Sequence, residues 1–364
     1  MQRILHYVIG NMNRGGLENN LMEIYREINK EEFQFDFITH SKNNYYEDEI
    51  KNLGGKVYAI PFKSNKYSEA LSRFKEILSE HEEYTIIHFH TSYAIILPEV
   101  YIAKNLGRKI FVHAHASAGE GIKKKLVNFL LKKKLDKLTD KHIAVSKNAA
   151  KWQFSKKTFE IKNYIIINNS INTKLFRYNP ELRETVRKSW DWQDKFIVGT
   201  TGRLVPGKNV QFLIELMDTL ELLIPNIKLI IVGDGSDRQK LEAIVHEKKL
   251  NSVEFIGNTD RVYEFLNAFD VFCFPSLYEG LGLSVIEAES TGVPCLINKK
   301  LPNELNIVTD VYRLSLKHTI WVKKIQEIYL SSYIRKNQFK AVNRAGFGIV
   351  ENVSIWERLY REEV

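Results

Sequence analysis

The sequence predicts an α/β protein made of two domains, each built around a parallel sheet. Short runs rich in Ile, Val and Phe alternate with longer amphipathic stretches, which is the pattern of repeated βαβ units. The chain has 364 residues, enough for two domains that each bury a core. The pattern loosens between Asn169 and Lys195 and leaves roughly one domain on each side. We therefore expect two doubly wound sheets with helices on both faces.

Apolar runs mark seven strands in the first half and six in the second. Parallel sheets bind ligands at the carboxyl ends of their strands, and two such sheets that face each other enclose a cleft. The residues that directly follow strands are therefore the candidates for a site. The expected strands are 4–9, 35–39, 57–60, 86–90, 110–115, 142–145 and 165–168, then 196–200, 228–232, 253–256, 271–275, 294–297 and 312–314.

The composition is that of a soluble globular protein. Apolar residues make up 44% of the chain, and no run approaches the roughly eighteen apolar residues of a membrane span. The apolar start, MQRILHYVIG, is too short for a signal peptide and fits a first buried strand. Cys273 and Cys295 lie in apolar strand-like runs, as expected for a reduced cytoplasmic protein. The spacing of cysteines and histidines is wrong for zinc, so no metal site is expected.

Most of the net charge of +9 lies in one segment. Residues 122–141, the lysine-rich segment, contain eight lysines against Asp136 and Asp140, which gives +6. Leucines and Phe129 are interleaved with the lysines, but the two lysine triplets point in nearly opposite directions around a helix. An electrostatic contact with an anionic membrane and a merely solvated helix both fit this pattern.

Two glycines follow the first expected strand. Gly15 and Gly16 open an amphipathic helix, and a glycine pair there lets backbone amides approach an anion at the positive end of the helix dipole. A tight strand-to-helix turn without a ligand explains the same residues.

The second half opens with a strand and a loop that carries two cations. Arg203 and Lys208 flank Pro206 and Gly207, and from such a constrained loop they can converge on a diphosphate. Solvated surface side chains are the alternative.

The most informative segment is DVFCFPSLYEGLGLSVIEAESTGVP. A buried strand ends near Pro275, and Gly280 and Gly282 prevent a helix before Leu283. Glu279 is thus expected on a loop and Glu287 on the following helix, with the amides near Gly282, Leu283 and Ser284 offered to phosphate oxygens. Two carboxylates around an anion site can hold the hydroxyls of a sugar and a ribose in line with a diphosphate.

The sequence resembles the retaining glycosyltransferases of family 4, which have the GT-B fold. The likeness covers nearly the whole chain, in the segments GGLENNL, IINNSINTKLF, TGRLVPGKN, IVGDGSDRQKLE and FIGNTDRVYEFLNAFDVFCFPSLYEGLGLSVIEAESTGVP. Its most specific element is a Glu, seven residues and a second Glu, matched by Glu279 and Glu287. The resemblance implies an acceptor-side domain over 1–175, a donor domain over 176–345, and a C-terminal helix in 346–364 that returns to the first domain.

The resemblance also implies roles for single residues. Glu287 would hold the donor ribose, Glu279 the transferred sugar, and Arg203 with Lys208 the diphosphate. Gly15 and Gly16 would approach that diphosphate from the other domain, and the family's histidine would be His115 or His113, with His115 preferred. The donor site implied by the same likeness further includes Gly233, Ile256, Gly280, Gly282, Leu283 and Ser284.

The implied reaction is metal-independent transfer of a sugar from a nucleoside-diphosphate sugar, with a uridine diphosphate donor expected. The chain has no Asp-x-Asp motif, and the family needs neither a metal nor another cofactor. Asn169 and Ser170 stand where the family commonly has Pro-Asn-Gly, so the turn at the hinge can differ from that of the family.

The pattern looks most like bacterial enzymes of capsule or exopolysaccharide assembly, with a glycan or lipid-linked acceptor at the inner face of the membrane. A nucleotide-sugar epimerase or sugar phosphorylase is the alternative on the same fold. A nucleic-acid-binding protein is disfavoured, because the lysines lack interleaved aromatic residues other than Phe129.

Overall fold

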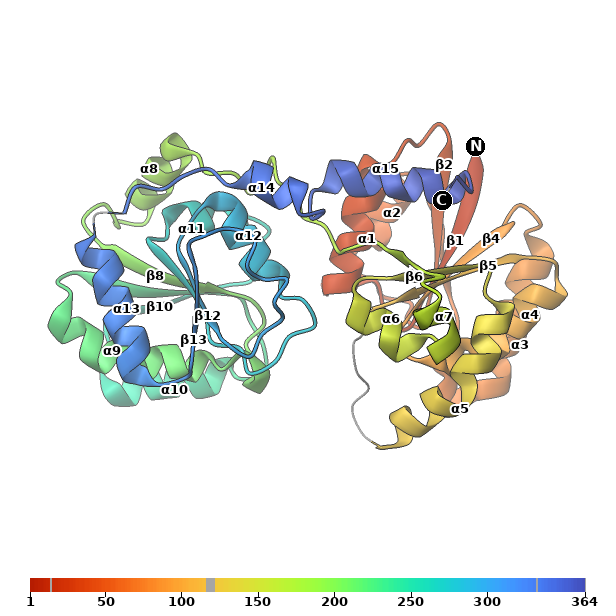
Figure 1. Ribbon diagram of the computed structural model, residues 1–364, viewed down its shortest axis with the longest axis horizontal. Helices are drawn as coiled ribbons and strands as arrows, with labels where there is room; N and C mark the ends of the chain where they lie inside the picture. Colours follow the sequence, from red (N-terminus) through yellow and green to blue (C-terminus); the bar gives the residue numbers. More distant parts are fainter. Residues whose placement is uncertain (14, 116–121, 332, 364) are drawn as a thin grey trace. The chain divides into compact units, whose positions relative to one another are not determined.

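The computed structural model describes residues 1–13, 15–115, 122–331 and 333–363, and the chain divides into two compact units. Unit 1 comprises Met1–Ser170 and Ile349–Val364, and unit 2 comprises Ile171–Gly348. The chain therefore passes between the units at 170–171 and at 348–349, where the sequence led us to expect joints at 175 and 345 (Figure 1).

Unit 1 is built on a seven-stranded parallel sheet with the order β3-β2-β1-β4-β5-β6-β7. Its strands are β1 (Gln2–Val8), β2 (Phe33–Thr39), β3 (Val57–Ala59), β4 (Ile86–Thr91), β5 (Lys109–Ala114), β6 (Lys141–Ala144) and β7 (Ile165–Ile166). Its helices are α1 (Gly16–Glu27), α2 (Glu47–Asn52), α3 (Lys63–Glu80), η1 (Ala94–Ile96), α4 (Leu97–Asn105), α5 (Ile122–Leu138), α6 (Lys147–Gln153), α7 (Lys156–Glu160) and α15 (Ile349–Tyr360).

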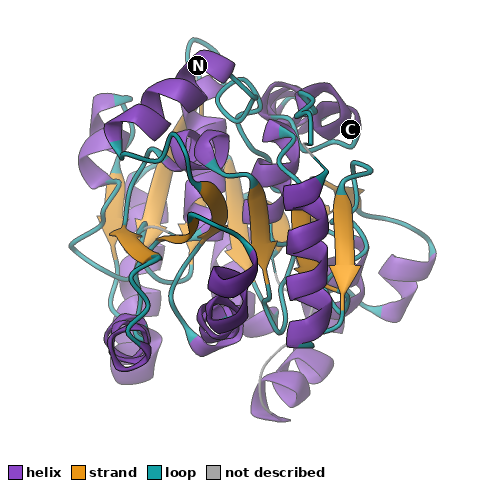
Figure 2. Ribbon diagram, turned by 90° about the vertical axis from the view of Figure 1, so that its left-hand side faces the viewer, coloured by secondary structure: helices purple, strands orange, loops and turns teal. Residues whose placement is uncertain are grey.

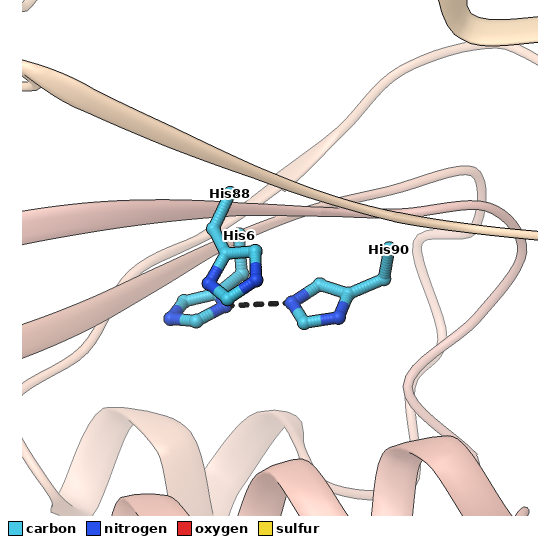
Figure 3. A group of neighbouring side chains, drawn as sticks. All are labelled: His6, His88 and His90. Carbon is cyan, nitrogen blue, oxygen red and sulfur yellow. Dashed lines mark hydrogen bonds between the residues drawn. The ribbon is translucent and has the colours of Figure 1, made fainter. Parts of the chain in front are cut away.

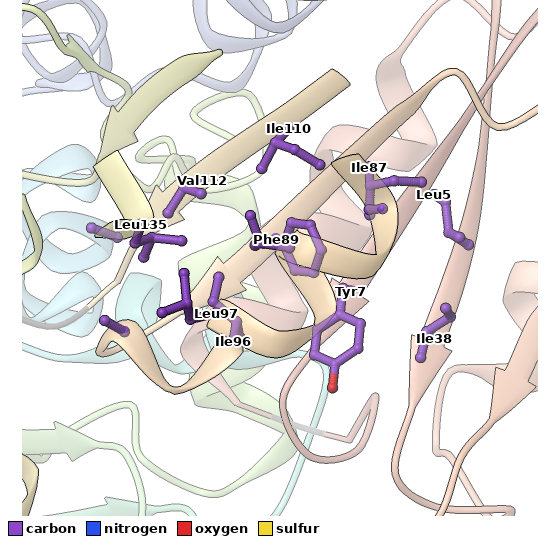
Figure 4. Close-up of a cluster of buried hydrophobic side chains, with 14 of the residues drawn as sticks. Leu5, Tyr7, Ile38, Ile87, Phe89, Ile96, Leu97, Ile110, Val112 and Leu135 are labelled. Atoms are coloured by element: carbon purple, nitrogen blue, oxygen red, sulfur yellow. The ribbon is translucent and has the colours of Figure 1, made fainter. Parts of the chain in front are cut away.

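The two faces of this sheet bury different side chains, because successive residues of a strand point to opposite faces. Leu5, Tyr7, Ile87 and Phe89 belong to one apolar core together with residues of α3, α4 and α5 (Figure 4). The other face carries Ile4, Val8 and Ile86 and packs against α1, α2 and α15. That second face also buries His6, His88 and His90, which is unusual for a protein core.

Unit 2 repeats the architecture with six parallel strands in the order β10-β9-β8-β11-β12-β13. Figure 2 shows strands in orange with helices in purple on both sides. The strands are β8 (Phe196–Thr201), β9 (Ile227–Val232), β10 (Val253–Gly257), β11 (Val271–Phe274), β12 (Cys295–Asn298) and β13 (Val311–Leu314). The helices are α8 (Pro180–Ser189), η2 (Pro206–Lys208), α9 (Val210–Leu223), α10 (Arg238–Lys248), α11 (Val262–Ala268), α12 (Leu283–Thr291), α13 (His318–Leu330) and α14 (Phe339–Arg344).

The predicted fold class is confirmed: both units are doubly wound parallel sheets, and each predicted strand overlaps an observed one. Cys273 and Cys295 are buried free thiols in β11 and β12, as their apolar surroundings predicted. Within the described ranges, no helix has both the length and the apolar character that a membrane span requires.

Candidate active site

The candidate site in unit 2 lies where the strand order reverses. β8 has β9 on one side and β11 on the other. The chain runs outward from β8 through β9 to β10, and then outward in the opposite direction from β11 through β12 to β13. Open parallel sheets bind ligands outside the carboxyl ends of strands at such a point. The loops that follow β8 and β11 carry the cations and carboxylates identified in the sequence.

Two glycines allow the loops after β8 and β9 to approach closely. Gly202 and Gly233 have φ of 138° and 136°, and a Cβ at Gly233 would clash with the Gly202 carbonyl. The Gly202 amide donates to the Val232 carbonyl at 2.9 Å, and the Gly233 amide donates to the Gly257 carbonyl at 2.9 Å. Gly233 therefore has a structural role beside the cationic loop. Its hydrogen bond ties the loop after β9 to the end of β10, where Ile256 is half-buried.

The cationic loop is fastened to the loop after β11. The Leu277 amide donates to the Gly207 carbonyl at 2.8 Å, and Asn209 Nδ2 donates to the Pro275 carbonyl at 3.3 Å. Asn209 has φ of 55°, in the left-handed region that asparagine tolerates well. These two hydrogen bonds fix the short η2 turn and with it the backbone of Lys208.

Lys208 and Glu279 form an ion pair at this point. Lys208 Nζ lies 2.6 Å from Glu279 Oε1, and the two side chains are 21% and 14% exposed. The ammonium also lies over the Phe274 ring, 4.6 Å from its centroid. Arg203 is exposed and lines a small cavity of about 10 Å³ together with Lys208, Gly202 and Phe274. That volume holds about one water, so a diphosphate does not fit into this cavity as it stands.

The N-terminus of α12 completes the group. Gly282 is its N-cap with φ of 89°, so the helix begins at Leu283 with its first amides unpaired in the helix. A Cβ placed on Gly202 would lie 3.9 Å from Lys208 Nζ and 4.0 Å from Ser284 Oγ. The structure thus brings the loop after β8, Lys208 and the start of α12 together. Glu287 is half-buried one turn further along α12, and Gly280 is exposed on the loop.

The glycine pair in unit 1 has a different neighbourhood from the one expected. Gly15 is the N-cap of α1, and a Cβ there would clash with the Glu18 carboxylate. A carboxylate thus already lies at the positive end of this helix, where the sequence suggested an anion. Gly16 has open space around its Cα.

His115 directly follows β5 and is half-buried. Its Nε2 lies 2.9 Å from Nδ1 of His90, so a second imidazole rather than a backbone carbonyl is its partner. Burial lowers the pKa of His115 to about 3, which keeps the ring neutral. His113 lies inside β5 and is fully buried.

Glu289 is a buried carboxyl group that the sequence analysis missed. It lies on α12, and its Oε2 accepts hydrogen bonds from the amides of Ile307 and Val308 at 2.9 and 3.0 Å. Its other oxygen is buried and accepts no hydrogen bond from any described residue. Burial raises the pKa of Glu289 to about 7. The sequence offered one signal that Glu289 is buried: it follows the apolar Val285 by four residues, so both lie on the same face of the helix.

Known proteins match both halves of the chain. Residues 14–175 match the family described as Glycosyltransferase Family 4, and residues 183–336 match Glycosyl transferases group 1. The chain is a family 4 glycosyltransferase. The two matches together leave only short segments outside the family and cover the loops of the candidate site.

Relatives that match most of the chain agree with this assignment. The glycosyltransferase is 28% identical to the putative glycosyltransferase EpsF of Bacillus subtilis, over 99% of this chain and 96% of the relative. It is 27% identical to an Escherichia coli UDP-Gal:α-D-GlcNAc-diphosphoundecaprenol α-1,3-galactosyltransferase, over 79% of this chain and 78% of the relative. The crystal structure of Anabaena HepE in complex with UDP superposes with a TM-score of 0.78, 17% identity and coverage of 99% and 100%. That superposition confirms the GT-B fold.

Proposed function

We propose that this glycosyltransferase moves a sugar from a UDP-sugar to a glycan or lipid-linked acceptor during assembly of a bacterial surface polysaccharide. The observation that carries the proposal is the Lys208–Glu279 pair at the start of α12, with Glu287 one turn along. UDP is the ligand named for HepE, and the galactosyltransferase relative is named for a lipid-linked acceptor. The epimerase, phosphorylase and nucleic-acid alternatives have no support among these relatives.

In the proposed complex, the diphosphate takes Lys208 away from Glu279 and binds it together with Arg203 and the amides of Leu283 and Ser284. Glu279 is then released to accept hydrogen bonds from the sugar hydroxyls, and Glu287 accepts them from the ribose. Oriented donors and cations of this kind stabilise the charge that develops on the leaving diphosphate.

We further propose that the reaction retains the anomeric configuration and needs no metal ion. Supporting this, two cations and a helix N-terminus offer the positive charge that a metal supplies in other transferases. His115 is proposed to contact the transferred sugar, and its neutral ring can both donate and accept a hydrogen bond. Gly15 and Gly16 are proposed to approach the diphosphate once Glu18 has turned away.

Replacing Glu287 by alanine should weaken donor binding by at least about tenfold and leave the fold intact. A hydrogen bond to a charged group contributes about 1.5–3 kcal/mol, and the side chain is only half-buried. Calorimetric titration of UDP-glucose, UDP-galactose, GDP-mannose and ADP-glucose into wild type would identify the donor, and the preferred one is then titrated into Glu287→Ala. Glu247→Ala, an exposed glutamate on α10, is the matched control. Wild-type affinity in Glu287→Ala would refute the ribose assignment.

We also propose that the lysine-rich segment contacts an anionic membrane, where a lipid-linked acceptor would present its sugar. On α5, Leu126, Phe129 and Leu130 are 56%, 69% and 59% exposed and share one face by their spacing. Lys125, Lys133, Lys134 and Lys137 are exposed along the same helix. Exposed apolar side chains beside cations are typical of interfacial helices.

Not every lysine of the segment is available for such a contact. Lys132 is half-buried, its Nζ donates to the Trp152 carbonyl at 3.4 Å, and burial lowers its pKa. Leu135 and Asn128 of α5 are buried within unit 1. The side chains of Lys123 and Lys124 lie outside the described residues.

Changing Lys125, Lys133 and Lys134 to Gln should lower binding to anionic vesicles by about a hundredfold at low salt. Each lysine near an anionic leaflet contributes about 1 kcal/mol. Co-sedimentation with phosphatidylglycerol vesicles, compared with phosphatidylcholine vesicles, measures the binding. Lys156, Lys157 and Lys162 changed to Gln, also exposed in unit 1, form the control. Equal binding of wild type to both lipids would show that α5 is merely a solvated helix.

A further inference from the structure

Five histidines lie together on one face of the unit 1 sheet. His6 is on β1, His88 and His90 are on β4, His113 is on β5, and His115 directly follows β5. In the strand register, His6 is opposite His88 and His90 is opposite His113. The rings are in contact distance, with centroids 5.3 Å apart for His6 and His88 and 4.5 Å apart for His88 and His90. We call these five residues the histidine cluster.

Three hydrogen bonds orient the rings of the cluster. His6 Nδ1 lies 2.9 Å from His90 Nε2, as Figure 3 shows, and His90 Nδ1 lies 2.9 Å from His115 Nε2. His88 Nδ1 lies 2.8 Å from the hydroxyl of Tyr360 on α15. No ring nitrogen takes part in more than one of these three bonds, and His90 uses both of its nitrogens, so the tautomers of His6, His90 and His115 are linked.

The cluster also contains ring nitrogens for which no described residue provides a partner. Nε2 of His6, Nε2 of His88 and Nδ1 of His115 are buried and make no hydrogen bond. A backbone group of Ile167 lies near His113 but completes no hydrogen bond to either of its nitrogens. An unsatisfied buried polar group costs about 1–3 kcal/mol, and an ion bound to Nε2 of His88 would remove this cost at that atom.

We propose that His6, His88 and His90 form a binding site for one divalent transition-metal ion, with Zn²⁺ as the reference ion. One nitrogen of each residue lies within 4.8 Å of the corresponding nitrogens of the other two. Nitrogens bound to tetrahedral zinc at about 2.0–2.1 Å lie about 3.3 Å apart, so small ring movements bring all three to an ion. The proposed ligands all lie in unit 1, and His90 is hydrogen-bonded at 2.9 Å to His115, the residue proposed to contact the transferred sugar.

The hydrogen bonds already favour the tautomers that coordination needs at His88 and His90. If His88 donates its Nδ1 proton to Tyr360, its unpaired Nε2 presents a lone pair. If His90 donates its Nδ1 proton to His115, its Nε2 does the same toward His6. The proton now between His6 and His90 then moves to the buried Nε2 of His6. Partners of this kind, which hold the other ring nitrogen of a ligand, orient metal-binding histidines.

The chemistry of the cluster also selects the ion. Burial lowers the pKa of each imidazole, so all are neutral, which is the form that binds metals. An all-nitrogen ligand set suits Zn²⁺, Cu²⁺ and Ni²⁺, whereas Mg²⁺ and Ca²⁺ require oxygen ligands. Sequence spacing gave no sign of the site, because register between β1 and β4 brings together residues 82 positions apart.

The test uses the full-length, tag-free protein, stripped with a chelator and then titrated with Zn²⁺. We expect one equivalent to bind and to raise the melting temperature by about 5 °C or more at a hundredfold excess over the dissociation constant, and Mg²⁺ to have no effect. Visible spectra after Co²⁺ loading should show tetrahedral coordination. Absence of stoichiometric Zn²⁺ binding would refute the proposal.

Variants locate the ion. His88→Asn retains a polar atom for Tyr360 and removes Nε2, and His6→Phe preserves a planar ring; each should abolish the thermal shift. Tyr360→Phe should weaken Zn²⁺ binding by about 10- to 100-fold, as expected for loss of a ligand's partner. His142→Gln and Tyr84→Phe, buried in unit 1 outside the cluster, should bind like wild type. Undiminished binding in both His88→Asn and His6→Phe would place the ion elsewhere and overturn the assignment.

Discussion

Replacing Lys208 by alanine should lower kcat/KM for sugar transfer about a hundredfold, mainly through kcat. The lysine is proposed to neutralise charge that develops on the leaving diphosphate, and one such group contributes about 3 kcal/mol to transition-state stabilisation. In the protein without donor, the substitution also removes the 2.6 Å ion pair with Glu279. Steady-state rates of UDP release at saturating acceptor, measured with EDTA present, give the effect free of any bound metal.

Lys228 provides the control for this experiment. It also forms an ion pair, with Glu254 at 3.2 Å, and it is 26% exposed, but it lies at the start of β9 rather than at the carboxyl end of a strand. Lys228→Ala should therefore transfer sugar at the wild-type rate. Full turnover in Lys208→Ala would show that Lys208 has no part in catalysis. Loss of all wild-type activity in EDTA, restored by added metal, would contradict metal-independent transfer.

Glu289 should make the protein less stable as the pH rises. Its carboxyl has a pKa of about 7 in the folded state, above its ordinary value of 4.5. The folded state therefore binds more protons than the unfolded state between these values, and stability is lost as the pH rises through this window. The expected loss is about 3 kcal/mol, complete somewhat above pH 7. Below about pH 4.5 the residue adds no pH dependence.

Glu289→Gln should remove this dependence, because glutamine resembles the protonated carboxyl and can still accept from the amides of Ile307 and Val308. Denaturant titrations of unit 2 fluorescence between pH 4.5 and 8 compare the two proteins. From pH 4.5 to pH 8, the unfolding free energy of wild type should fall by about 3 kcal/mol relative to that of Glu289→Gln. Glu247→Gln, at an exposed position, should follow wild type. Parallel profiles for wild type and Glu289→Gln would show that Glu289 does not titrate in this range.

The sequence was sufficient to predict where the strands lie, because a strand that is buried on both faces is a nearly uninterrupted apolar run. FITH, IIVGD and VFCFP carry that signal within a few residues, and β2, β9 and β11 begin and end near the predicted positions. The carboxyl-end rule then selected Lys208, Glu279 and Ser284 from the second half of the chain, and the structure brings these together. Arg203 lines the same small cavity, whereas no contact shows what Gly280 does.

Features that depend on partners distant in the chain were not predictable in this way. The lysines of α5 differ in exposure because Trp152 lies against Lys132, and nothing near residue 132 in the sequence indicates this. Glu289 is buried by the loop at 307–308, and this burial raises its pKa. Neither the covering loop nor the pKa could be predicted from the residues near Glu289 in the sequence. In each case packing, rather than local pattern, decides the chemistry.

The discontinuous composition of unit 1 has a consequence for the order in which the protein matures. Domains generally fold as units while the chain is being synthesised. Unit 2 is continuous, so it can fold as soon as residue 348 has left the ribosome. The sheet of unit 1 is made first, yet Trp356 and Tyr360, which cover His88 and Phe35, are added only afterwards. Until then the part of this face that α15 covers is exposed, and a chain truncated after residue 348 would contain one complete unit and one that lacks α15.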